Sequence, residues 1–249
     1  MVSVNNYSFP ILFIDSICIK FIYKVIFIVN MHETVKNLLS IQDNIKVNFE
    51  KLNIDNIPKI IAVSKTFKID QILPLIDFGH IDFGENKVQE AIEKWTDIKE
   101  KNPQIKLHMI GKLQTNKVKF AVKIFDYIHS VDSEKLAKKI ADEQLKVKKK
   151  IKIFLQVNIG DESQKSGVNK NYLNKLVSYC EEIKLDLIGL MCIPPANLDS
   201  DFYFKEMREL NKSFGFKELS MGMSSDYLEA TKNLSTYLRI GSNIFGQRF

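Results

Sequence analysis

A lysine stands directly after a run of apolar residues in the first third of the chain. Residues 60–64, Ile-Ile-Ala-Val-Ser, have the composition of a buried β-strand, and Lys65 follows them. In an α/β barrel the carboxyl ends of the strands carry the chemistry, so this strand would deliver an amine to that edge. An amine held there is a candidate for Schiff-base formation with an aldehyde. Because the chain contains 36 Lys and Arg residues, Lys65 alone does not decide the chemistry.

Two turns near the end of the chain combine glycine with hydroxyl side chains. Residues 219–226 contain Gly222 and Ser224, and residues 238–246 contain Gly241 and Ser242. Glycine lets a ligand approach the backbone closely, and a short helix after each turn would point N–H groups at a phosphate. An amine together with two such turns indicates pyridoxal phosphate (PLP) as the ligand.

Arg239 precedes the second of these turns on the last predicted strand. If Leu238 and Ile240 face the surrounding helices, strand alternation directs Arg239 toward the interior. A guanidinium can donate a hydrogen bond to the pyridine nitrogen of PLP but cannot accept its proton. An acid in this position would protonate the ring and favour carbanion chemistry, which arginine therefore discourages. The alternative for Arg239 is a surface or structural ion pair.

The elements that must position these residues follow a regular order from Met31 onward. Short runs rich in β-branched residues alternate with helical patterns, as in repeated βα units that build a parallel sheet. The predicted strands are residues 59–64, 80–84, 106–110, 127–131, 151–158, 185–191, 217–221 and 237–240. The predicted helices between them are residues 69–78, 87–95, 115–124, 133–145, 171–183, 201–214 and 226–234. This order predicts one α/β domain, a (β/α)8 TIM-type barrel, with an extra amphipathic helix before the first strand.

The first thirty residues differ from the rest of the chain. Residues 9–29 are rich in Ile and Phe, but Pro10, Asp15, Lys20 and Lys24 interrupt them. A membrane helix needs about 20 predominantly apolar residues, and charges inside so short a stretch are costly. We therefore expect no membrane association, an extension at residues 1–30 that is spurious or dispensable, and a PLP-binding barrel domain at residues 31–249.

Composition argues against several other classes of protein. The net charge is +6, but the lysines are spread along the chain among acidic residues, so we expect no nucleic-acid partner. A dense basic run at residues 146–152 is expected at the face of the barrel opposite the active site. The three cysteines and the histidines His80, His108 and His129 lack metal-ligand spacing, so no metal site or disulfide framework is expected.

Six segments of the chain carry a family resemblance. They are residues 62–65 (Ala-Val-Ser-Lys), 83–86 (Phe-Gly-Glu-Asn), 108–117 (His-Met-Ile-Gly-Lys-Leu-Gln-Thr-Asn-Lys), 189–191 (Gly-Leu-Met), 220–224 (Ser-Met-Gly-Met-Ser) and 239–242 (Arg-Ile-Gly-Ser). In this order, from about Met31 to Phe249, the sequence resembles the pyridoxal phosphate homeostasis protein family. That family is similar to the barrel half of alanine racemase, so the resemblance implies the same barrel, fold type III of PLP proteins.

The resemblance also implies roles for single residues. Lys65 would bind PLP covalently as an internal aldimine, and Arg239 would meet the pyridine nitrogen. Asn86 and Met191 would lie near the ring. The phosphate would be held by Ser224, Gly241 and Ser242. Lys165 falls in a further segment similar to the family, and its role stays open between a solvated loop lysine and a second PLP site.

Two classes of function compete on this evidence. In the first, the protein is a cytoplasmic, monomeric carrier or buffer in PLP homeostasis, which passes PLP to apo PLP enzymes and has no catalytic residues. In the second, it is an amino-acid racemase, which needs another acid/base on the face opposite the lysine. No tyrosine is predicted in that position, so the carrier is favoured. A sugar-phosphate barrel enzyme with a Schiff-base lysine is a weaker third alternative, because no carboxylates near Lys65 are predicted to assist it.

Overall fold

The computed structural model describes residues 31–52, 57–162, 164–196 and 198–247. The expectation for residues 1–30 falls outside these residues, and the barrel domain predicted from residue 31 falls almost entirely within them. Within the described residues, no helix has the length and apolar character that a membrane span requires.

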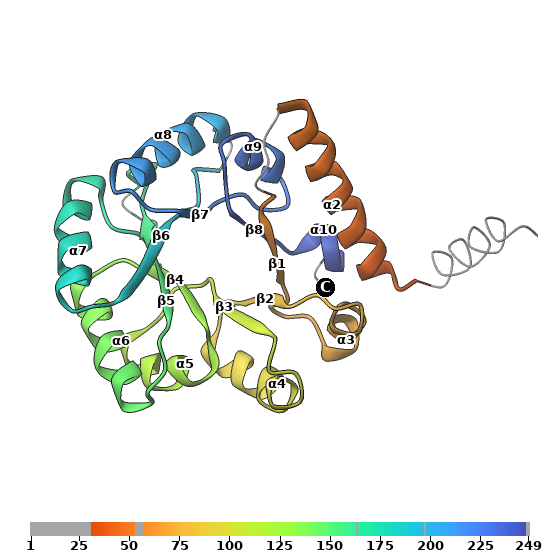
Figure 1. Ribbon diagram of the computed structural model, residues 1–249, viewed down its shortest axis with the longest axis horizontal. Coiled ribbons are helices and arrows are strands. Elements are labelled where there is room, and N and C mark those ends of the chain that lie inside the picture. The colour runs from red at the N-terminus through yellow and green to blue at the C-terminus, as the bar shows by residue number, and fades with distance from the viewer. Residues whose placement is uncertain (1–30, 53–56, 163, 197, 248–249) are drawn as a thin grey trace, which may run out of the picture.

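Eight parallel strands close into a barrel in chain order, as the sequence predicts. The strands are β1 (Lys59–Val63), β2 (Asp82–Glu85), β3 (Lys106–Met109), β4 (Tyr127–Val131), β5 (Lys152–Val157), β6 (Asp186–Cys192), β7 (Glu218–Ser220) and β8 (Tyr237–Ile240). The barrel closes where β1 pairs with β8, with Ile61 opposite Arg239. This closure places the segment that follows β1 beside the turn that follows β8 (Figure 1).

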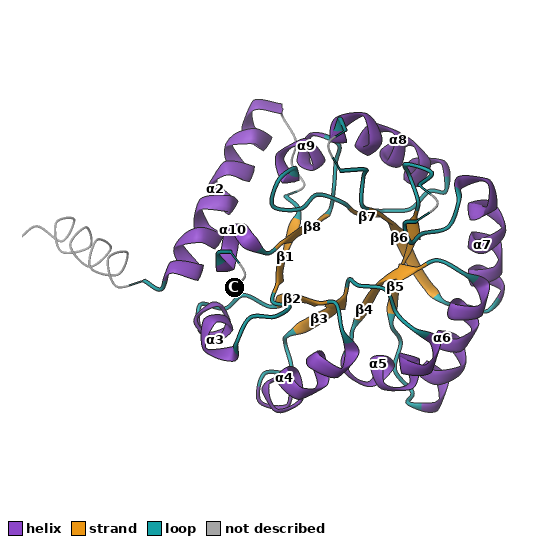
Figure 2. Cartoon of the chain, turned by 180° about the vertical axis from the view of Figure 1, so that it is seen from behind, coloured by secondary structure: helices purple, strands orange, loops and turns teal. Residues whose placement is uncertain are grey.

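Helices form the outer ring of the barrel (Figure 2). They are α2 (Glu33–Leu52), α3 (Ile69–Asp77), α4 (Val88–Lys101), the 3-10 turn η1 (Thr115–Lys117), α5 (Val118–Ile124), α6 (Glu134–Lys146), α7 (Lys170–Glu182), α8 (Ser200–Ser213), α9 (Tyr227–Lys232) and α10 (Ser242–Phe245). The predicted extra helix is α2, whose buried side chains Val35, Leu38, Ile41, Ile45 and Phe49 recur at helical spacing. It packs against α3, α9 and α10 and so covers the β1–β8 closure.

The apolar core has two parts, which follow from strand alternation. Most buried side chains lie between the strands and the helices, and a smaller group fills the interior of the barrel. The interior group consists of Ile61, Tyr127, Phe154, Met191 and Tyr237. Filled interiors of this kind are the rule for eight-stranded barrels, so the open volume lies at the ends of the strands.

The basic run lies at the amino ends of the strands, as expected. Lys149 donates to the Phe125 carbonyl at 2.6 Å and forms an ion pair with Asp126, just before β4. Lys150 approaches Asp186 at the start of β6. Two lysines of the run therefore pair with carbonyl and carboxylate groups at the amino ends of the strands, which we call the closed face of the barrel.

Candidate cofactor site

A cavity of about 490 Å³ opens at the carboxyl ends of the strands. Six of the residues predicted from the sequence line it: Lys65, Asn86, Ser224, Arg239, Gly241 and Ser242. The sequence reasoning missed the apolar part of the wall, which Val63, Ile110 and Ile193 provide. A strand-end cavity with a few polar groups in an apolar wall is the form that small-molecule sites take in this fold.

The backbone on both sides of Lys65 is held by side chains of α4. The Ser64 carbonyl accepts a hydrogen bond from Lys94 Nζ at 2.9 Å. The Thr66 N–H donates to Glu90 Oε1 at 2.6 Å, and Thr66 has a left-handed φ of +68°. A threonine rarely adopts this conformation without support. Lys65 therefore leaves the strand at a turn that α4 stabilises.

A buried carboxylate lies beneath this turn. Glu85 is completely buried at the end of β2, where its Oε1 accepts from Ser64 Oγ at 2.8 Å. The same oxygen accepts from Lys94 Nζ and from Trp95 Nε1, each at 3.0 Å. In the sequence analysis, Glu85 appears only within the segment 83–86 that carries the family resemblance. The sequence feature that could have indicated this cluster is a glutamate at the end of a buried strand, followed on the next helix by Lys94 and Trp95.

The two glycine- and serine-containing turns lie together as the sequence predicts. Ser224 Oγ accepts from the Gly241 N–H at 3.3 Å, and the Asn243 side-chain amide donates to the Ser224 carbonyl at 2.9 Å. Gly222 has a φ of +89°, and a Cβ there would lie 2.5 Å from the Ala230 Cβ, so only glycine fits. We call Ser224, Gly241 and Ser242 the phosphate cup.

Arg239 points into the barrel rather than to the surface. Its side chain is 4% exposed, Nη1 donates to Ser220 Oγ, and Nη2 donates to the Cys192 carbonyl, both at 2.8 Å. No carboxylate among the described residues forms an ion pair with it. Burial lowers the pKa of the guanidinium, which nevertheless stays charged at neutral pH. The predicted inward orientation is therefore confirmed, and neither alternative form of ion pair is present in the described part of the chain.

Comparison with known proteins agrees with this arrangement. The family model of the alanine racemase N-terminal domain matches residues 37–248. The pyridoxal phosphate homeostasis protein of Pasteurella multocida is 34% identical over 225 residues, which are 86% of this chain and 97% of the relative. The protein of that name from Escherichia coli K12 is 33% identical and covers 88% of this chain and 98% of its own. The chain belongs to the pyridoxal phosphate homeostasis protein family.

Solved structures give the same result for the fold. PipY of Synechococcus elongatus, in a structure with PLP bound, is 32% identical, has a TM-score of 0.72, and covers 81% of this chain and 100% of its own. Its structure without PLP has a TM-score of 0.76 at 31% identity and covers 86% of this chain and all of PipY. Alanine racemase of Clostridium difficile, at 15% identity and a TM-score of 0.63, shares the barrel fold alone.

Two residues that the family resemblance singled out do not line the cavity. Met191 is completely buried and packs in the interior group below it, while Ile193, two residues further along, lines the wall. Lys165 pairs with Glu162 at 2.6 Å and donates to the Pro194 carbonyl at 3.2 Å. Lys165 is therefore held in its loop by a carboxylate and a carbonyl.

One polar atom of the cavity wall lacks a protein partner. Asn86 Oδ1 is buried, and no hydrogen-bond donor reaches it within the described residues. A buried acceptor without a donor is costly, so a donor from a ligand would satisfy it. With an amine, a phosphate cup and an inward guanidinium in the same wall, the residues present fit PLP.

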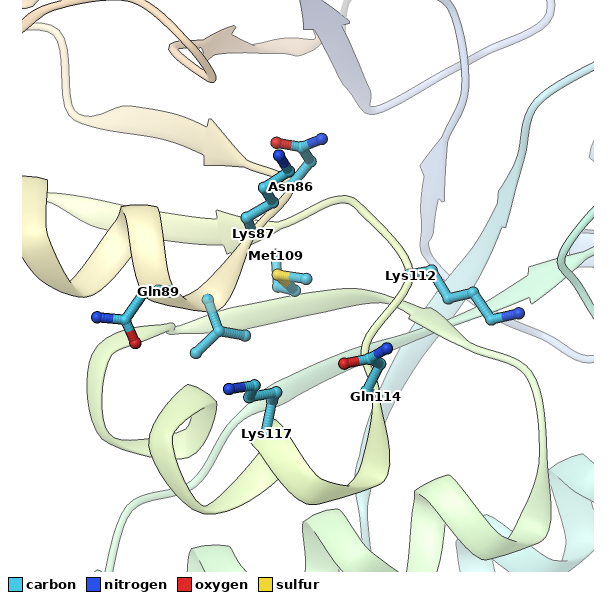
Figure 3. A pocket seen from close by; sticks show the side chains of 8 residues that line it. Asn86, Lys87, Gln89, Met109, Lys112, Gln114 and Lys117 are labelled. Atoms are coloured by element: carbon cyan, nitrogen blue, oxygen red, sulfur yellow. The ribbon is translucent and has the colours of Figure 1, made fainter.

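A smaller cavity of about 330 Å³ lies beside the first and shares Asn86 with it (Figure 3). The two polar turns after β2 and β3 form it, and Lys87, Lys112 and Lys117 stand around it. Figure 3 shows that their ammonium groups point in different directions rather than toward one centre. The arrangement therefore does not resemble an anion-binding site, in which the donors converge on one point.

The thiols of Cys180 and Cys192 are buried and free within the described residues. Cys192 is completely buried, and burial raises the pKa of its thiol to about 12. Cys180 is buried in α7, and burial likewise raises its pKa to about 12. In the described part of the chain, no three His, Cys, Asp or Glu side chains are placed to hold a metal ion.

Proposed function

We propose that this protein binds PLP in the cavity at the carboxyl ends of the strands and takes part in PLP homeostasis as a carrier or buffer. The observation that carries the proposal is that Lys65, the phosphate cup and Arg239 line one cavity. The names of the curated relatives and the structure of PipY with PLP bound support it.

Each group of the cavity has a role in this proposal. PLP supplies an aldehyde that an amine can capture reversibly. Lys65 provides that amine and holds the ligand covalently, at a position fixed by its two anchored neighbours. The phosphate cup binds the phosphate through hydroxyl and backbone N–H groups. Arg239 donates to the pyridine nitrogen and Asn86 accepts a hydrogen bond near the ring.

The charge of Arg239 favours binding of PLP without catalysis. A guanidinium leaves the pyridine nitrogen unprotonated, which weakens the ring as an electron sink. Racemisation also requires a second acid/base opposite the lysine. Among the described residues of the cavity wall, Lys65 and Arg239 are the titratable side chains. These features support the carrier over the racemase.

The direct test compares wild type with Lys65→Ala and a control variant, Lys112→Ala, whose lysine lies in the adjacent cavity. We expect wild type and the control to gain visible absorption on addition of PLP. After borohydride reduction, peptide mass mapping should place a stable adduct on Lys65. Wild type that takes up no PLP, or a reduced adduct on another lysine, would overturn the proposal.

The carrier role implies partner proteins that receive PLP, and a part of the chain that is sufficient to bind it. We propose transfer of PLP from a monomeric, cytoplasmic protein to apo PLP enzymes, with residues 31–249 sufficient for binding. Loaded protein should reactivate an apo PLP enzyme, and a chain that starts at Met31 should bind PLP as the full chain does. Incubation of loaded protein with L-amino acids should give no D-isomers at enzymatic rates, and such turnover would favour the racemase.

A further inference from the structure

A chain of hydrogen-bonded side chains passes through the interior of the barrel. His108 Nε2 lies 3.0 Å from Asp82 Oδ1, and His108 Nδ1 lies 2.9 Å from His129 Nε2. His129 Nδ1 lies 2.9 Å from Ser220 Oγ, which accepts from Arg239 Nη1 at 2.8 Å. We call Asp82, His108, His129 and Ser220 the polar chain. It ends on the guanidinium that lines the cofactor cavity.

The polar chain runs from one wall of the barrel to the other. Its residues belong to β2, β3, β4 and β7, and Figure 2 shows β2 to β4 on the side of the barrel opposite β7 and β8. Asp82 is the first residue of β2, and Ser220 is the last residue of β7. The chain therefore also connects the closed face of the barrel to the level just below the cavity.

The interior holds both histidine rings in place. His108, His129 and Ser220 are completely buried. The His108 ring stacks on Tyr127 with centroids 4.2 Å apart, and the His129 ring stacks on Phe154 at 4.3 Å. Since neither ring can turn toward water, each nitrogen must find its partner within the chain.

The two ends of the chain fix the position of every proton in it. A guanidinium only donates hydrogen bonds and a carboxylate only accepts them. The Asp82 carboxylate therefore requires a proton on His108 Nε2. In a neutral His108 ring Nδ1 then accepts, so His129 donates from Nε2, and His129 Nδ1 accepts the proton of the Ser220 hydroxyl. Both histidines are assigned as neutral rings with the proton on Nε2.

The electrostatic surroundings agree with neutral rings. Burial lowers the pKa of His108, and it lowers the pKa of His129 well below the ordinary value. The charged groups that act on His108 are Asp82, Asp126 and Lys59, with His80 nearby. His129 faces His108 and the guanidinium of Arg239. A proton added to either ring would set two donors against each other within the chain.

We propose that the polar chain is a positioning device for Arg239, through which Asp82 on the closed face orients the guanidinium that meets the cofactor. All its dipoles point the same way, so the negative end at Asp82 acts on the buried positive end at Arg239. Hydrogen bonds in such a chain polarise one another. The consequence for the cofactor rests on the proposed function, whereas the proton positions do not.

The first measurement uses the full-length protein without ligand. Long-range ¹H–¹⁵N NMR of the histidine rings should show His108 and His129 neutral with the proton on Nε2 at pH 7.5. Asp82→Asn replaces the obligatory acceptor by an amide that can also donate, so we expect the single tautomer at His108 to be lost. A control carboxylate is Asp186, the first residue of β6, which approaches Lys150 at 3.9 Å outside the polar chain, and Asp186→Asn should leave both tautomers unchanged.

The second measurement reads the bound cofactor. We expect Asp82→Asn and Ser220→Ala each to shift the visible absorption of bound PLP and its pH profile and to weaken binding about tenfold, the weight of roughly one hydrogen bond to a charged group. Asp186→Asn should leave the spectrum as in wild type. Ser220→Ala breaks the chain beside Arg239, so it tests the proposal even if Asp82→Asn does not fold.

The outcomes separate this inference from the proposed function. Histidines in another tautomer, or Ser220→Ala with the spectrum and affinity of wild type, would overturn the positioning role. Wild type that takes up no PLP would overturn the proposed function, and the NMR result would still decide whether the polar chain is ordered as assigned.

Discussion

The carboxylate beneath Lys65 gives a prediction whose size can be worked out from its contacts. Glu85 is completely buried, and one oxygen accepts from Ser64, Lys94 and Trp95 at 2.8–3.0 Å. Glu85→Gln keeps the shape of the side chain but removes its charge. All three donors bond Oε1, and Oε2 has no hydrogen-bond partner within the described residues, so the amide can keep its oxygen on the donors and the main loss is the charge that compensates Lys94.

The expected loss of stability is smaller than that for a fully isolated ion pair. Breaking a buried pair by removing one partner costs about 3–5 kcal/mol. Lys94 is 10% exposed and keeps Glu90 at 3.0 Å and the Ser64 carbonyl at 2.9 Å. These contacts continue to stabilise the Lys94 ammonium group after Glu85 loses its charge. We therefore expect Glu85→Gln to lower the free energy of unfolding by about 2–3 kcal/mol.

Urea denaturation followed by circular dichroism measures this change. With a slope of about 2–3 kcal/mol/M, the midpoint should fall by about 1 M while the slope stays constant. Glu93→Gln is the matched control, because Glu93 lies exposed on the helix that follows Glu85 and accepts a hydrogen bond from the exposed Gln89 side chain. The control should change stability by less than about 0.5 kcal/mol. A loss below about 1 kcal/mol for Glu85→Gln would refute the reasoning.

Three further predictions concern pH, backbone contact and ligand. The pKa values of His108 and His129 lie below 6.5 in the folded protein, so the unfolded chain binds more protons in acid. The contribution of these histidines to the free energy of unfolding should be constant above pH 6.5 and should fall below it by up to about 1.4 kcal/mol per pH unit for each histidine. Denaturation curves that do not change between pH 7.5 and pH 5 would contradict this. Gly189→Ala would drive a Cβ into the Glu218 carbonyl oxygen, so little folded protein should be recovered, and normal yield and melting temperature would count against the close approach of β6 to β7. PLP at about 100 times its Kd should stabilise wild type by about 2.7 kcal/mol and Lys65→Ala by much less, and removal of the ligand should reverse the gain; equal thermal shifts would show that Lys65 does not hold it.

The barrel could be predicted because its information is local. Runs of β-branched residues indicate the strands, and the spacing of apolar residues indicates the helices. Eight alternating strands and helices are compatible with few topologies. The carboxyl ends of parallel strands then meet at one face, so Lys65 and the phosphate cup had to approach each other. Alternation alone also directed Arg239 inward, and its contact with Ser220 follows from that orientation.

The sequence could not show which inward-facing residues lie at the level of the cavity, because that depends on their position along the barrel axis. Met191 and Ile193 both face the interior, but only Ile193 reaches the cavity. Which of two inward residues lies at the level of the site depends on the tilt and stagger of the strands, and no single strand encodes these. The partners His129 and Ser220 are separated by 91 positions in the sequence, so their hydrogen bond was likewise hidden.

The polar chain and the Glu85 cluster also differ in what they contribute to the protein. Glu85 is compensated locally by Lys94, and removal of either leaves a charge at the edge of the barrel beside Lys65. Arg239 has no such neighbour among the described residues, and its connection to a carboxylate runs through neutral side chains to Asp82. Apolar replacements of similar volume often equal or exceed buried polar networks in stability. A barrel interior selected only for stability would therefore not need histidines at positions 108 and 129, and their presence is best accounted for by the orientation they impose on the guanidinium at the cofactor cavity.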